Sequence, residues 1–177
     1  MNPIYVLPIG DIAGDALIFA QRAIQQRFNH ICNVLAHIDI PGNALDRNRL
    51  QYSSAQILRK IIELCPPDAK RIIGITEVDL FVPVLTFVFG QAQLDGIAAI
   101  VSTCRLRPEF YGLTPSMRIT LERLDKEITH ELGHTFGLTH CHNSACVMYF
   151  SNSIREIDNK TAEFCGACAR MLAGKLN

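Results

Sequence analysis

Residues 130–140 bring three histidines and one glutamate close together, in the pattern His-Glu-Leu-Gly-His-Thr-Phe-Gly-Leu-Thr-His. His130 and His134 are four positions apart, so on a helix their imidazoles lie on one face and can bind the same metal ion. Glu131 follows the first histidine, where its carboxylate can reach a water at the metal without being a ligand itself. This spacing is typical of a zinc ion that acts on water.

His140 can supply a third nitrogen only if the chain reverses after this helix. A continuous helix would carry His140 about 9 Å beyond His134, at 1.5 Å per residue. Gly137 suits the turn, because glycine adopts positive φ without steric cost and is common just past helix ends. Three neutral histidines leave a fourth tetrahedral position open for water, which indicates a catalytic rather than a structural zinc. A helix that merely carries histidines is the plain alternative, and the added Gly137 and His140 argue against it.

Four of the seven cysteines lie after residue 140. Cys165 and Cys168 form a CxxC motif, and four residues separate Cys141 from Cys146; both spacers are usual for zinc thiolate sites. We therefore expect a closed Cys₄ structural zinc. A thioredoxin-like redox motif is the alternative, but it would follow a strand and open a helix in a βαβ unit. We instead place Cys165 within a C-terminal helical segment, beside the other cysteine pair.

Composition restricts the class of protein. A length of 177 residues is suited to one domain, and 17 basic residues balance 17 acidic ones. Without a basic cluster, we expect neither nucleic acid nor an anionic membrane as a partner. The first residues lack a secretory signal pattern, and no apolar run is long enough to span a bilayer. An odd number of cysteines does not suggest a disulfide framework. We therefore expect a cytoplasmic protein, and we further expect it to be a monomer.

Short apolar runs alternate with helical patterns in the first half of the chain. We expect strands at residues 3–9, 31–40 and 71–76, helices at 15–28 and from Ser53 or Ser54 to Pro66, and a loop at 41–52. Asp11 or Asp15 could cap the first helix. This alternation is typical of βαβ crossovers and a parallel sheet.

Two further strands are expected at residues 85–90 and 97–102. The gap between them is too short for a parallel crossover, so the pair should be antiparallel. A loop at 105–116 then leads to an active-site helix at 118–136. Little regular structure is expected before a last helix at 159–172. The predicted fold class is α/β, with a mixed, mainly parallel five-stranded sheet, one antiparallel edge strand and helices packed on it.

The run from His130 to Cys141, followed by Cys146, Met148, Cys165 and Cys168, closely resembles the archaemetzincins, a subfamily of the metzincin zinc metallopeptidases. The resemblance implies one metallopeptidase domain over residues 1–177. Its N-terminal sheet and helix subdomain would span 1–137 and its zinc-stabilised C-terminal subdomain 138–177. It implies two zinc ions, one catalytic at His130, His134 and His140, and one structural at Cys141, Cys146, Cys165 and Cys168.

The resemblance also implies roles for two segments outside the ligands. Met148 would lie on a tight turn with its thioether beneath the imidazoles, and an ordinary core methionine is the alternative. Residues 84–90 would form the edge strand along the cleft and hydrogen-bond an extended peptide. A structural strand with a covered edge is the alternative for residues 84–90.

The expected activity is zinc-dependent hydrolysis of peptide bonds in a peptide or protein substrate. Zinc would lower the pKa of its water to about 7, and Glu131 would act as general base and deliver the proton to the leaving amine. Tyr149 could contribute a hydroxyl, although a tyrosine that merely packs beside Met148 is the favoured alternative. Arg105, Arg107 and Tyr111 could meet a substrate side chain.

A non-catalytic zinc-binding interaction module is the main alternative, and a thiol redox protein is a further one. Glu131 argues against the first, since a purely structural site has no use for that carboxylate. Because His140 and Cys141 are adjacent, the structural zinc would also fix the turn that returns the third histidine.

Overall fold

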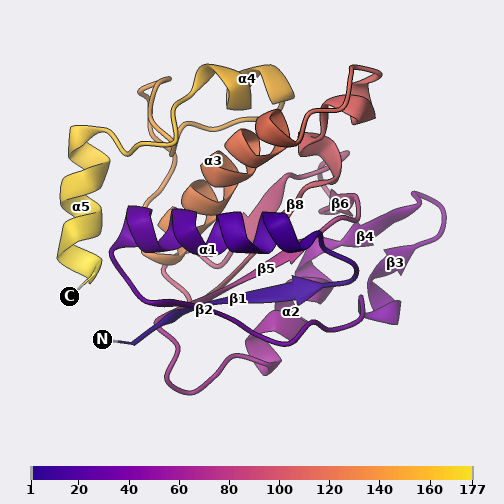
Figure 1. Cartoon of the computed structure of the whole chain (residues 1–177), viewed down its shortest axis with the longest axis horizontal. Helices are drawn as coiled ribbons and strands as arrows, with labels where there is room; N and C mark the ends of the chain where they lie inside the picture. The colour runs from indigo at the N-terminus through magenta and orange to yellow at the C-terminus, as the bar shows by residue number, and fades with distance from the viewer. Residues whose placement is uncertain (1, 177) are drawn as a thin grey trace.

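The computed structural model describes residues 2–176 and contains a five-stranded sheet in the order β2-β1-β5-β8-β7 (Figure 1). Four strands are parallel, and β7 runs antiparallel to β8 at one edge. The strands are β1 (Ile4–Ile9), β2 (Cys32–Val34), β5 (Arg71–Thr76), β7 (Gly90–Ala92) and β8 (Ala98–Ser102). The predicted fold class is therefore confirmed.

Helices cover both faces of this sheet because its central strands are apolar on both sides. Helices α1 (Gly14–Phe28) and α3 (Met117–Thr135) pack on one face, and α2 (Ser54–Glu63) packs on the other. Two C-terminal helices, α4 (Ile154–Asn159) and α5 (Gly166–Leu176), add side chains to the core cluster that holds α1 and α3. Residues on both sides of position 137 thus share one core.

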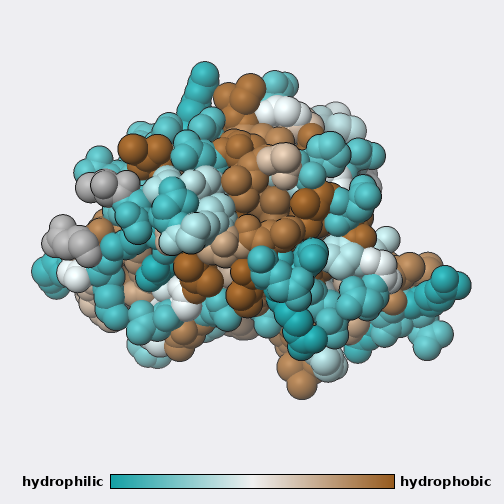
Figure 2. Space-filling model, turned by 90° about the horizontal axis from the view of Figure 1, so that it is seen from below, coloured by the Kyte–Doolittle hydropathy of each residue, from teal (hydrophilic) through white to brown (hydrophobic). Residues whose placement is uncertain are grey.

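The face that carries α2 is less completely covered. Seen from below, where α2 lies in Figure 1, apolar side chains gather in the middle of this face with hydrophilic residues around them (Figure 2). One short helix leaves several apolar residues of this second core cluster only partly buried. Within residues 2–176, no helix is long and apolar enough to cross a membrane.

A second, three-stranded sheet was not predicted. It consists of β3 (Leu45–Asp46), β4 (Gln51–Ser53) and β6 (Leu80–Phe81), in the order β3-β4-β6. The predicted loop at 41–52 therefore contains two short strands. Strands of two or three residues are too short for a periodic apolar pattern, so their pairing depends on tertiary contacts.

The second predicted strand and the first helix cap also differ from expectation. Only Cys32–Val34 is regular strand, and beyond it the chain follows β1 through separate bonds such as Leu35 N–H to Val6 O, 2.8 Å. The N-cap of α1 is Ala13, without a side-chain hydrogen bond, so the prediction of an aspartate cap was wrong. The second helix begins at Ser54, which is one of the two predicted starts, and Ser53 is its N-cap.

Residues 85–89 are not a strand, although residues 85–90 were predicted to be one. After a turn in which Leu85 N–H donates to Val82 O, side chains satisfy the next carbonyls. Leu85 O accepts from Arg49 Nη1 at 3.1 Å, and Thr86 O accepts from Gln51 Nε2 at 2.9 Å. Only Val88 forms an isolated bridge, and the edge strand begins at Gly90.

The C-terminal region contains more helix than predicted, with different limits. Ser153 and Glu156 form a capping box that starts α4, and the pattern Ser-x-x-Glu in the sequence could have indicated it. The last helix begins at Gly166 rather than residue 159. Cys165 therefore precedes this helix, and the prediction that it lies within a helix was wrong. The position of Cys165 therefore no longer argues against a redox motif, whereas the close grouping of the four thiols still does.

Candidate metal centres

The C-terminal half of α3 carries the first histidine pair and ends where the turn was predicted. Gly137 has φ +85°, and its N–H donates to His134 O at 2.9 Å while Leu138 N–H donates to Gly133 O at 3.1 Å. These two bonds form a Schellman motif. A Cβ at Gly137 would lie 3.0 Å from Asp95 Oδ1. Glycine therefore satisfies both the backbone angle and the available space.

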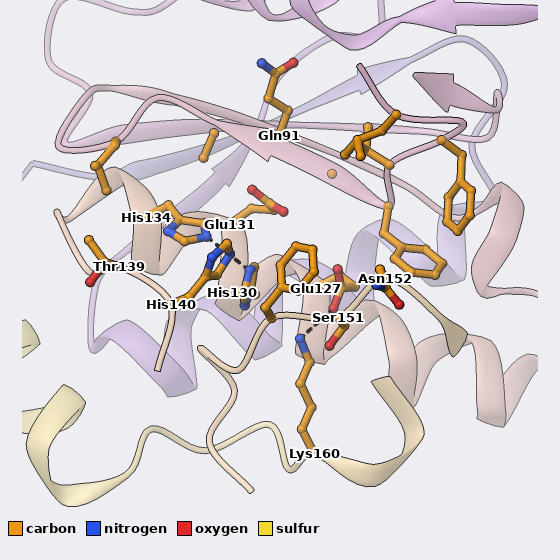
Figure 3. Close-up of a pocket in the computed structure, with 18 of the residues that line it drawn as sticks. Gln91, Glu127, His130, Glu131, His134, Thr139, His140, Ser151, Asn152 and Lys160 are labelled. Carbon is orange, nitrogen blue, oxygen red and sulfur yellow. Dashed lines mark hydrogen bonds and ion pairs between the residues drawn. The ribbon is translucent and has the colours of Figure 1, made fainter. Parts of the chain in front are cut away.

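The turn brings His140 back to the helix, so that three imidazoles converge (Figure 3). One ring nitrogen of each histidine lies within 4.8 Å of the corresponding nitrogens of the other two. His130 Nε2 and His134 Nε2 are 3.1 Å apart, and the His140 ring is stacked with that of His130.

The opposite nitrogens of the first two rings show which atoms are free to bind metal. His130 Nδ1 lies 2.8 Å from Val147 O, and His134 Nδ1 lies 2.7 Å from Leu138 O. A carbonyl oxygen only accepts, so each Nδ1 carries the proton and each Nε2 of the neutral ring carries a lone pair. Two lone pairs this close repel each other unless a cation lies between them. Two nitrogen ligands of a tetrahedral zinc lie about 3.3 Å apart, so the residues fit this ion.

Burial also favours the neutral, metal-binding form of these histidines. Desolvation lowers the pKa of His130 well below its usual value and lowers the pKa of His134 and His140 as well. The positive charge of Lys160 acts in the same direction on all three. At neutral pH the rings are therefore uncharged without any help from a metal.

Glu131 is buried beside these histidines, and its carboxylate lies between them and the strand that carries Gln91 (Figure 3). Gly90 on β7 permits this approach, because a Cβ there would lie 2.7 Å from Glu131 Cγ. Burial raises the pKa of the Glu131 carboxyl well above its usual value; Glu127 adds to this effect and Lys160 opposes it.

The histidines and Glu131 open into a cleft of about 670 Å³. One wall consists of residues 85–92 and Leu94, and the opposite side carries Thr139 and residues 150–152. The segment 84–90, which was predicted to lie along the cleft, does line it from Leu85 onward, although only Gly90 is in a strand.

The four C-terminal thiols form a second group. Every Sγ of Cys141, Cys146, Cys165 and Cys168 lies within 4.8 Å of the others, and Cys141 Sγ is 3.8 Å from Cys165 Sγ. Backbone N–H groups point at two of these sulfurs, from Asn143 to Cys141 and from Cys165 to Cys146. Hydrogen bonds, first from the Cys168 backbone, lower the pKa of Cys165 to about 7, whereas burial raises the pKa of Cys168.

An ion pair near the metal site was not predicted from the sequence. Lys160 Nζ lies 2.9 Å from Glu127 Oε1, and both side chains are buried in the wall of the cleft. Lys160 Nζ also contacts Tyr149 O at 3.5 Å. Glu127 lies one turn before Glu131 on the same helix face, so its place near the site could have been predicted from the sequence. Nothing in the sequence around Lys160 indicates that it lies there too.

Arg71 contacts the C-terminal end of α3, and this contact was also not predicted from the sequence. Its guanidinium stacks over the Phe136 ring at 4.2 Å, and its Nε donates to Thr135 O at 3.2 Å. A cation at this position satisfies a terminal carbonyl and interacts favourably with the helix dipole.

The remaining candidates lie around the site in different ways. Met148 is fully buried against α3, with its Sδ 2.5 Å from where a Cβ at Gly133 would be. Phe150, rather than Tyr149, lines the cleft. Arg105 forms an ion pair with Asp79 and Arg107 with Glu77. Neither these arginines nor Tyr111 is among the residues that line the cleft.

A mixed sheet with a three-histidine group at the end of its active-site helix defines a zinc metallopeptidase of the metzincin type. The family model of peptidase family M54 matches residues 21–174. The archaemetzincin of Methanocaldococcus jannaschii is 41% identical, covering 96% of this chain and 92% of that protein. The archaemetzincin of Pyrococcus furiosus is 39% identical, covering 98% and 93%.

Solved structures agree with these relatives. The archaemetzincin of Archaeoglobus fulgidus, complexed with malonate, matches with a TM-score of 0.84 and 35% identity over 96% of this chain and 99% of that one. The archaemetzincin of Methanopyrus kandleri matches with a TM-score of 0.86 and 34% identity over 98% and 94%. The chain belongs to peptidase family M54, the archaemetzincins, and the resemblance inferred from its motif is confirmed.

Proposed function

We propose that this metallopeptidase binds its catalytic zinc through His130, His134 and His140 and uses Glu131 as general base. The observation that carries the proposal is the facing pair of Nε2 lone pairs, 3.1 Å apart, beside a buried carboxylate. When bound, zinc supplies Lewis acidity, which lowers the pKa of water and polarises a carbonyl group.

Glu131 holds and moves the proton in this proposal. Its carboxylate accepts a proton from the attacking water and then donates it to the nitrogen of the leaving amine. The burial that raises the pKa of Glu131 makes the ionised form a stronger base, and the positive charge of Lys160 favours that ionised form. Gly90 keeps space for the carboxylate between α3 and β7.

β7 is suited to hold an extended peptide beside Glu131. Gln93 N–H donates to Ala98 O of β8 at 3.0 Å. Backbone groups alternate in direction along an antiparallel strand, so Gly90 and Ala92 direct theirs away from β8, toward the open edge of the sheet. A substrate that pairs with this edge would place its backbone along the cleft by β-augmentation.

We also propose a second, structural zinc at the four thiols. Four sulfurs in mutual contact range fit a closed tetrahedral site, with no position left for water. Cys141 follows His140, and Cys146 precedes Val147, whose carbonyl orients His130. The structural metal would therefore hold both ends of the segment that completes the catalytic site.

The proposed working form is a monomeric domain over residues 1–177 in the cytoplasm. Side chains from before and after residue 137 share one core, and a four-thiolate site needs the reduced cysteines of such a compartment. Sedimentation of the zinc-loaded protein tests the monomer, and a stable dimer would contradict it.

Metal content and hydrolysis together test the proposed chemistry. Wild type and Glu131→Ala should each contain two zinc ions per chain by elemental analysis, with cleavage of a diverse peptide library only in wild type. Hydrolysis retained in Glu131→Ala would remove Glu131 as the base, and a single zinc in wild type would remove the structural site.

A further inference from the structure

Three large apolar side chains on the cleft wall are strongly exposed. Leu85 is 46% exposed, Leu94 is 59% exposed and Phe150 is 46% exposed, and all three line the cleft. Large apolar side chains that are exposed along a cleft are a feature of ligand-binding grooves. Phe150 adjoins the metal site directly, since the centroid of its ring is 5.0 Å from that of His140.

The wall that carries Leu85 is held in place before any substrate binds. Arg49 and Gln51 donate to consecutive carbonyls of this wall, those of Leu85 and Thr86. The Arg105 guanidinium lies 4.1 Å over the Phe87 ring and is itself fixed by two bonds to Asp79, at 2.6 and 2.7 Å. Arg105 thus positions the wall. A wall that is ordered before binding loses less conformational entropy when a peptide binds, which increases the affinity for that peptide.

Leu94 lies at the other end of β7, in the turn to β8, and this turn is also fixed. Asp95 N–H donates to His134 O at 2.9 Å, which ties the turn to the end of the active-site helix. Lys175 of α5 forms an ion pair with Asp95 at 3.2 Å. The position of Leu94 relative to the histidines is therefore set by three separate elements.

Leu85 and Leu94 flank the point at which the chemistry would occur. Gly90, which lies against Glu131, is between them along the chain. An extended peptide rises about 3.4 Å per residue, so one aligned with β7 would pass Leu85 on one side of Glu131 and Leu94 on the other.

The charged residues of the cleft do not favour charged substrate side chains beside Leu85 and Leu94. Among its lining residues, the charged groups are Glu127, Glu131 and Lys160. Glu127 and Lys160 neutralise each other in a buried pair, and Glu131 is assigned to the reaction. The exposed part of the wall is therefore complementary to apolar groups.

We propose that the cleft selects extended peptides with a large apolar side chain on each side of the cleaved bond, one recognised by Leu85 and the other by Leu94. This inference rests on the proposed function, because the proposed cleavage position beside Glu131 defines the two sides.

The test measures binding and cleavage separately. Octapeptides of alanine would carry leucine, serine or aspartate at each position in turn. Their Kd for the zinc-loaded Glu131→Gln variant, by fluorescence anisotropy, is compared with kcat/KM in zinc-loaded wild type. Leucine should improve both quantities about tenfold over serine at one position on each side, and aspartate should be worse than serine.

Substitutions of exposed leucines show which residue recognises the side chain on each side of the cleaved bond. Leu85→Ser should remove the preference on one side and Leu94→Ser on the other. Leu113→Ser is the control, since Leu113 is also 59% exposed but lies outside the cleft lining. Equal binding of leucine and serine peptides, or an equal effect of Leu113→Ser, would overturn the proposal. Selective binding without cleavage would contradict the proposed function alone, and cleavage without selectivity would contradict this inference alone.

Discussion

His130 Nδ1 lies 2.8 Å from the carbonyl oxygen of Val147, a residue that directly follows Cys146. This bond fixes the ring orientation that points Nε2 at the other histidines. Val147 is itself held in place, since its N–H donates to Glu163 O at 2.9 Å. A ligand of the proposed catalytic zinc is therefore oriented by a backbone group whose neighbour is a ligand of the proposed structural zinc.

Loss of the structural zinc should weaken the catalytic site. Cys165→Ser removes one thiolate at a position remote in sequence from all three histidines. We expect one zinc per chain to be lost and the affinity of the histidine site to fall about 10- to 100-fold, as for loss of groups that orient ligands. Zinc content after dialysis against graded chelator measures both effects. Cys104→Ser, outside the thiol group, is the matched control. If Cys165→Ser retained two zinc ions with unchanged affinity, the prediction that the two sites depend on each other would be wrong.

Gly90→Ala should lower the rate of hydrolysis while leaving the zinc content of the protein unchanged. The added Cβ would lie 2.7 Å from Glu131 Cγ and 2.7 Å from Ile100 O, so the carboxylate or the strand must shift. Because displacement of about 1 Å can cost about 100-fold in rate, we expect a fall in kcat of that order. Steady-state kinetics at equal zinc content measures it.

A glycine without neighbours supplies the control for this substitution. A Cβ at Gly14 would meet nothing within 4 Å, so Gly14→Ala should keep wild-type kcat. A Gly90→Ala variant as fast as Gly14→Ala would show that the contact with Glu131 has no role in positioning the base.

The polar pattern of the site was predictable from the sequence, whereas most of the groups that orient it were not. The i, i+4 spacing of His130 and His134 and the conformational freedom of Gly137 are local properties, so the residue types reveal them. Val147 acts through its carbonyl, which every residue has, so its side chain carries no signal. Lys160 reaches Glu127 across the tertiary structure, and nothing near it in the sequence indicates a buried partner.

The sheet shows the same division between local and tertiary information. β1, β5 and β8 are apolar on both faces, and their sequences show it. Residues 85–89 have strand-like composition, but side chains from distant parts of the chain bond the carbonyls of Leu85 and Thr86, and the segment forms the cleft wall instead of a regular strand.

Lys160→Met should destabilise the protein because it leaves the Glu127 carboxylate buried without its partner. Removing one member of a buried ion pair typically costs about 3–5 kcal/mol, whereas replacing both by apolar residues is often neutral. We therefore expect Lys160→Met to lower the free energy of unfolding by about that amount and Glu127→Leu/Lys160→Met to recover most of it. Urea denaturation of the zinc-loaded proteins measures both, and equal stability of the two variants would contradict the prediction.

In the metal-free protein, the titration of His130 should reduce stability as the pH falls below 6.5. Burial lowers the pKa of His130 in the folded state, while in the unfolded chain it stays near 6.5. Below pH 6.5 the unfolded state therefore binds more protons, which favours unfolding. Glu131 acts oppositely as the pH rises above the usual pKa of a glutamate, because its raised pKa makes the folded state hold a proton that the unfolded chain has lost.

The histidine effect is best isolated in a Glu131→Gln background, which removes that opposing titration. Urea denaturation of metal-free Glu131→Gln should give a free energy of unfolding that decreases from pH 7 to pH 5. Adding His130→Asn should make this dependence less steep, whatever its effect on stability at pH 7, because only His134 and His140 of the three histidines then still titrate with a lowered pKa. His37→Asn is the control, since His37 lies outside the metal group. An equal slope with and without His130 would show that this buried imidazole does not control the acid sensitivity of the site.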